Sequence, residues 1–61
     1  MTLSRYLEIK GIGKSDFART LGVSPAAVSR YIRNARTPRK KILLKIETLT
    51  RGEVRAEDFY R

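Results

Sequence analysis

Residues 14–33, KSDFARTLGVSPAAVSRYIR, decide the fold of this 61-residue chain. They read as two short helices joined by a tight turn. Ala18 is small where the two helices must cross, Gly22 stands at the turn, and Val28 faces back into the helix pair. This pattern is typical of a helix-turn-helix, whose second helix enters the major groove of DNA. The stretch therefore predicts a helix-turn-helix unit and contact with nucleic acid.

Capping signals set the expected limits of these two helices. Gly13 is the expected N-cap of a helix over residues 14–21, which ends at Gly22 because glycine takes the left-handed conformation without steric cost. Ser24 followed by Pro25 predicts the N-cap and the first residue of the next helix, which extends to residue 33 or 34. The two helices are therefore short and lie close to the turn.

One further helix is expected before the motif. Leu3, Tyr6 and Leu7 fall on a single helical face, so residues 3 to about 10 are predicted to be helical. Gly11 follows as a stop signal. This helix supplies a third apolar face for a small core.

The segment after the motif is compatible with two secondary-structure predictions, a helix and a β-hairpin. Thr37 before Pro38 repeats the cap-and-proline pair, which predicts a helix over residues 38–50 closed by Gly52, followed by a short helical turn over residues 56–59. The inward stripe of this helix would consist of Ile42, Leu43, Ile46 and Leu49.

The apolar residues of this segment also alternate with polar ones, as they do in a β-strand. Ile42, Leu44 and Ile46 are spaced by two residues. In this alternative, Arg51 and Gly52 form a hairpin turn that leads into a second strand over residues 53–59. We favour the helix, because a proline start and a glycine stop bracket it. The expected fold is all-α, a small helix-turn-helix domain with four to five helices, and the alternative is α+β with a C-terminal β-hairpin.

The chain reads as one domain over residues 1–61, with a dimerisation or packing segment over residues 38–60. It is strongly basic: 14 Lys and Arg stand against 6 Asp and Glu, giving a net charge of +8. No acidic residue occurs from Phe17 to Ile46, whereas eight cations fall in that window. Such a one-sided field suits a polyanion.

Composition excludes several other classes. The chain has no cysteine and no histidine, which removes disulfides, zinc fingers and most general acid–base catalysis. We therefore expect no enzyme, no metal, no cofactor and no small-molecule substrate. With no long apolar run and no secretory signal, we expect a cytoplasmic protein without a membrane partner.

The outward face of the third helix carries the predicted base-reading residues. Pro25 and Ala26 are small enough to approach thymine methyl groups, and Ser29 reaches a base or a phosphate. Arg30 matches the O6 and N7 acceptors of guanine, a contact worth about 1–3 kcal/mol of discrimination. Arg33 completes this face. Phosphate contacts are expected from polar and cationic residues around it, namely Lys14, Ser15, Ser24, Asn34, Arg36, Arg39 and Lys40.

These residues also carry a resemblance. Residues 14–33, with Ala18, Gly22, Val28 and Ile32, resemble the lambda-type Cro/CI repressors of phages. The wider pattern of LGVSPAAVSRYI, RTP and KIETLTRGEVRAEDFY is similar to Cro proteins of temperate phages and to their YdaS-type prophage relatives.

The resemblance implies a small transcriptional repressor that binds a pseudo-palindromic double-stranded DNA operator as a homodimer. In that family the residues corresponding to Pro25, Ala26, Ser29 and Arg30 face the base edges, and the residue matching Lys14 meets a phosphate. The resemblance also implies an alternative function, that of an antitoxin-like or protein-interaction module of a prophage system. A helical tail implies a weak, DNA-assisted dimer, whereas a hairpin tail implies a stronger one.

Overall fold

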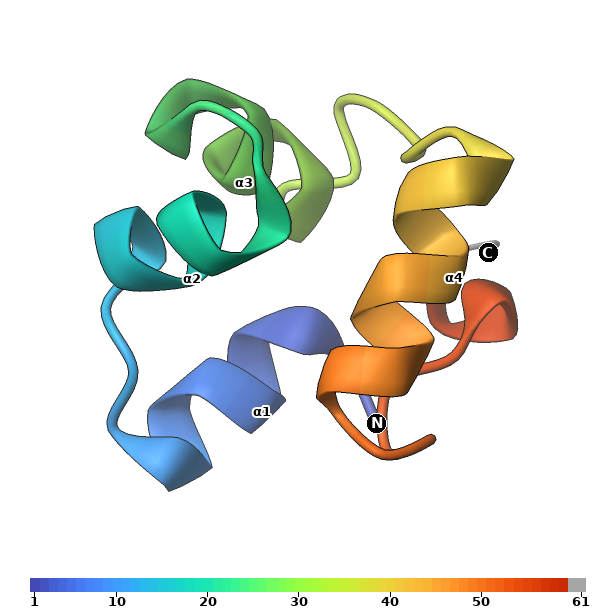
Figure 1. Cartoon of the computed structure of the whole chain (residues 1–61), viewed down its shortest axis with the longest axis horizontal. Coiled ribbons are helices and arrows are strands. Elements are labelled where there is room, and N and C mark those ends of the chain that lie inside the picture. The colour runs from blue at the N-terminus through green and yellow to red at the C-terminus, as the bar shows by residue number, and fades with distance from the viewer. Residues whose placement is uncertain (60–61) are drawn as a thin grey trace.

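Five helical elements follow one another in residues 1–59, the part of the chain that the computed structural model describes (Figure 1). They are α1 (Leu3–Lys10), α2 (Lys14–Leu21), α3 (Pro25–Ile32), α4 (Lys40–Leu49) and the 3-10 turn η1 (Ala56–Phe59). This part contains no strand, so the all-α prediction is confirmed and the hairpin alternative is wrong. The expected packing segment ends at Tyr60, which lies outside the described residues. Within them, no helix has the length and apolar character that crossing a bilayer requires.

The predicted end signals Gly11, Gly13, Gly22 and Ser24 are all caps in the structure, but α3 ends at Ile32 rather than at residue 33 or 34. The Ser24 hydroxyl accepts a hydrogen bond from the Ala27 N–H at 3.2 Å, with Pro25 as the first residue of α3. Gly22 ends α2 with φ 85°, and its N–H donates to Ala18 O. This left-handed residue turns the chain sharply enough for α3 to pack on α2, as in a helix-turn-helix.

The start of α4 differs from the prediction by two residues. Arg39, rather than Thr37, is the N-cap, and it is extended with φ −65° and ψ 157°. Pro38 is buried rather than being the first residue of the helix. Its apolar ring is therefore part of the packed interior. Arg39 is extended, so the helix begins only at Lys40.

The end of α4 explains why the hairpin does not form. Arg51 and Gly52 both have positive φ, 54° and 80°, which suits a hairpin turn as well as a helix end. Here the Gly52 N–H donates to Glu47 O at 2.8 Å, a bond that closes the last turn of α4. The Thr50 side chain is buried, and its hydroxyl donates to Ile46 O at 2.8 Å and accepts from the Val54 N–H at 3.1 Å. One hydroxyl thus joins α4 to the segment that follows it.

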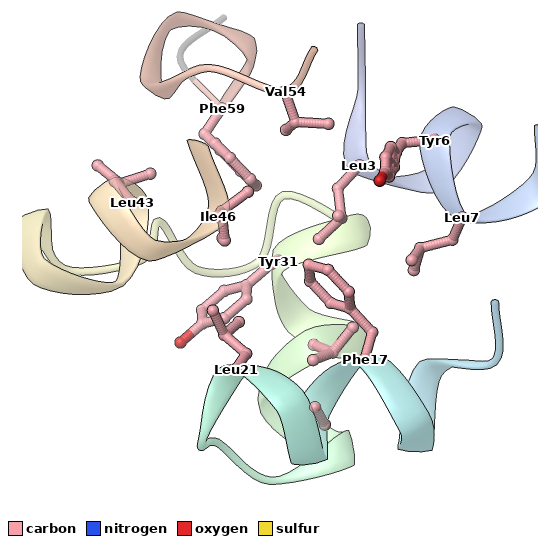
Figure 2. Packing of buried hydrophobic residues seen from close by; sticks show 12 residues of the cluster. Leu3, Tyr6, Leu7, Phe17, Leu21, Tyr31, Leu43, Ile46, Val54 and Phe59 are labelled. Atoms are coloured by element: carbon pink, nitrogen blue, oxygen red, sulfur yellow. The ribbon is translucent and has the colours of Figure 1, made fainter. Parts of the chain in front are cut away.

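All five elements contribute to a single core (Figure 2). Leu21, Val28, Ile46 and Val54 have no measurable exposure, and aromatic rings from α2, α3 and η1 fill the space between the helices. Figure 2 shows Ile46 and Phe59 directed towards the side chains of α2 and α3. The predicted stripe of α4 is wrong at Leu49, which is 40% exposed, because Thr50 takes the inward position at that end of the helix.

Candidate nucleic-acid interface

The two faces of α3 differ sharply in burial. Val28 and Tyr31 are buried against the rest of the domain, and Ile32 is half-buried. The opposite face is formed by the five predicted base-reading residues, of which four are exposed and Ser29 is half-buried: Pro25, Ala26, Ser29, Arg30 and Arg33. The helical period of 3.6 residues places these side chains together on one surface. This surface presents small groups at the start of the helix and two guanidinium groups towards its end.

The turn before α3 contributes Ser24. Its oxygen accepts the capping bond from Ala27, and within the described residues its hydroxyl proton has no acceptor. An exposed hydroxyl with a proton to donate, next to the first turn of a helix, suits an anionic oxygen. The predicted phosphate contact at Ser24 is therefore compatible with its capping role.

The N-terminus of α2 forms one flank of this surface. Lys14 and Ser15 are its first two residues and both are exposed. The N-cap, Gly13, provides no side chain, so backbone N–H groups of the first turn point outward without a side-chain cap. Asp16 also lies in this turn, with its carboxylate 3.9 Å from the guanidinium of Arg19. A helix N-terminus with a lysine attracts anions, and the nearby carboxylate weakens that attraction.

The segment that leads into α4 forms the other flank. Asn34 follows the end of α3 and has a positive φ of 59°. Arg36 is exposed in the loop after it. Arg39 is the N-cap of α4 and Lys40 its first residue, and no side chain caps this terminus either. The predicted phosphate residues thus fall into two groups, one at the start of α2 and one at and before the start of α4.

The predicted DNA-contacting cations form no ion pair within residues 1–59. In residues 1–59 the ion pairs join Met1 to Asp58 and Arg19 to Asp16, so none involves a predicted base-reading or phosphate-contacting residue. Within the described part of the chain, the guanidinium and ammonium groups therefore have no carboxylate partner. Such unpaired cations release counter-ions when they meet phosphates.

One candidate was missed from the sequence. With the expected start at Pro38, Lys41 is the fourth residue of the helix and is interpreted as part of its solvated face. The actual start at Lys40 puts Lys41 in the first turn, next to uncapped backbone N–H groups. The buried ring of Pro38 is the cause of this difference, and composition alone does not reveal that burial.

Together these features define a small all-helical protein with a helix-turn-helix unit whose second helix carries a polar, basic outer face. The chain belongs to the family described as bacterial toxin YdaS, which matches residues 3–61. No curated protein and no solved structure gives a significant match. Membership confirms the resemblance to YdaS-type relatives, while the likeness to Cro and CI repressors stays a prediction.

Proposed function

We propose that the chain is a sequence-specific, double-stranded DNA-binding transcriptional regulator of the Cro-repressor type. The observation that carries the proposal is the outer face of α3 and its C-cap, where Pro25, Ala26, Ser29, Arg30 and Arg33 form one surface and, among residues 1–59, have no carboxylate partner. An α-helix fits the major groove, and small residues followed by arginines suit thymine methyl groups next to a guanine. The uncapped N-termini of α2 and α4 support this orientation because each suits a backbone phosphate.

The position of α3 also determines the spacing that we expect between the two half-sites of the operator. Two copies bound as a dimer would place their α3 helices in successive major grooves, about 34 Å apart, on a pseudo-palindromic site. The charge of each copy favours a dimer that assembles on DNA, because phosphates neutralise the repulsion between two chains of net charge +8.

Selection from a random duplex library, followed by titration of the enriched duplex against random DNA, tests the proposal. Replacing Arg30 by alanine should lower affinity for the selected duplex about 5- to 150-fold, the equivalent of 1–3 kcal/mol, and leave random DNA nearly unchanged. Arg5→Ala is the matched control, because Arg5 is exposed on α1 and its loss changes the net charge equally. Equal losses on both duplexes would remove Arg30 from base reading, and an unselective parent would refute specific repression.

The family description favours a second candidate, a toxin- or antitoxin-like protein that acts through a protein partner. Induced expression in bacteria separates the two. If growth inhibition disappears with Arg30→Ala but persists with Arg5→Ala, the effect operates through the α3 face. If it persists when Arg30 is replaced and DNA binding is lost, the second candidate is the better one.

A further inference from the structure

The outer side of α4 carries an open apolar groove that the proposed DNA contacts do not use. Its volume is about 310 Å³, and its walls are formed by Thr20, Leu44, Lys45, Thr48 and Leu49. Leu44 is 56% exposed and Leu49 is 40% exposed. Thr20 belongs to α2, so the groove lies where the end of α2 meets α4, two helices that stand beside each other in Figure 1.

Helix α4 is therefore apolar on two sides. Leu43 and Ile46 belong to the core, and Figure 2 shows Ile46 directed towards the side chains of α2 and α3. The 3.6-residue period turns residues 44, 45, 48 and 49 away from that face. A surface helix usually presents polar residues on its outer side. Leu44 and Leu49 lie there instead, and neither belongs to the packed core of residues 1–59.

Charge around the groove has one sign. A Cβ atom placed on Gly22 would lie 3.7 Å from Nζ of Lys45, so this ammonium sits at the end of α2 and borders the groove. Lys41 lies one turn earlier on the same side of α4 and is exposed. Neither lysine forms an ion pair within the described residues.

These observations discriminate between possible occupants. A second copy packed groove to groove would bring Lys41 and Lys45 of both chains together, and each copy carries a net charge of +8. A nucleic acid would find lysines but would leave the leucine side chains unused. An amphipathic helix with apolar anchors and acidic flanks satisfies both the leucines and the lysines.

We infer that this groove binds an acidic amphipathic helix of a partner protein. The inference goes beyond DNA binding and does not depend on it. The leucine side chains would receive apolar anchors spaced by three or four residues, and carboxylates beside these anchors would meet Lys41 and Lys45.

Two synthetic helical peptides of equal length test the inference in an NMR titration of the full chain. Both carry leucines at i and i+4, one with glutamates and the other with lysines beside them. We expect the glutamate peptide to bind with shifts centred on Thr20, Leu44, Thr48 and Leu49, and the lysine peptide to leave the spectrum unchanged. Leu44→Ser with Leu49→Ser should weaken binding at least tenfold, and Ile9→Ser is the control because Ile9 is equally exposed on α1.

A charge swap provides the second arm. The variant with both Lys41→Glu and Lys45→Glu should lose the glutamate peptide and gain the lysine peptide. The inference is overturned if neither peptide binds the parent chain, or if the shifts centre on Arg30 and Arg33. Sedimentation equilibrium that reveals a dimer dependent on Leu44 would also overturn it in favour of a second copy. The leucine variants should keep full affinity for the selected duplex, which separates this outcome from failure of the DNA proposal.

Discussion

Replacing Thr50 by valine tests how strongly the end of α4 depends on one hydroxyl. Thr50 is 1% exposed, and the valine has almost the same shape, so the change removes polar contacts without leaving a cavity. The hydroxyl donates to Ile46 O and accepts from the Val54 N–H. Without it, the Val54 N–H is buried and has no acceptor, because Val54 has no measurable exposure. Leaving such a group unsatisfied costs about 1–3 kcal/mol.

That cost is large for a chain of 61 residues, whose total stability is on the order of 3–9 kcal/mol. The melting temperature should fall by roughly 4–8 °C for each kcal/mol lost. Urea titration followed by far-UV circular dichroism measures the loss, with Thr48→Val as the control. Thr48 is exposed on the same helix, so its replacement should change stability by less than about 0.5 kcal/mol. If Thr50→Val is as stable as this control, the hydroxyl does not fasten Val54 to α4.

Three further predictions concern a carboxylate, a charge and a turn. The Arg55 N–H donates to the Asp58 carboxylate at 2.8 Å and holds the pKa of Asp58 below its ordinary value of 3.8. This stabilisation is complete above pH 3.8 and is lost as the pH falls through the lower folded pKa, so Asp58→Asn should flatten the acid limb of a stability–pH curve. Asp16→Asn should strengthen binding to random duplex DNA several-fold at low salt, because it removes a negative charge next to Lys14; unchanged affinity in gel-shift titrations would place the α2 terminus away from phosphates. Gly22→Ala should destabilise the fold by about 1–2 kcal/mol in urea, because φ is 85° there; a midpoint equal to that of the parent would contradict a left-handed turn.

The sequence predicts the first three helices well because their end signals are local. Thr2, Gly13 and Ser24 precede helices, and Gly11 and Gly22 end them, and each depends on residues within one turn. The burial of Pro38 depends instead on distant packing, and this is why the start of α4 was predicted two residues too early. The inward position of Thr50 and the exposure of Leu49 are likewise set by tertiary contacts.

The apolar pattern of the α4 segment is compatible with two secondary structures, a helix and a strand. Ile42, Leu44 and Ile46 satisfy a strand period as well as parts of a helical one. The structure resolves the ambiguity through the Thr50 hydroxyl and the backbone hydrogen bond from Gly52 to Glu47, and an apolar pattern records neither of them. By contrast, the outward face of α3 follows directly from helical periodicity, since Val28 and Tyr31 identify the buried side.

The N-terminus is held beside the last part of the described chain. The Met1 ammonium donates to Glu53 O at 3.0 Å and lies 3.1 Å from the Asp58 carboxylate. Asp58 and Glu53 thus lie close to the point where this sequence begins. These contacts need a free ammonium, so a tag fused to Met1 would replace it by an uncharged amide and would remove the ion pair with Asp58. A tag at this end therefore changes the packing of η1 against the first residues as well as the length of the chain.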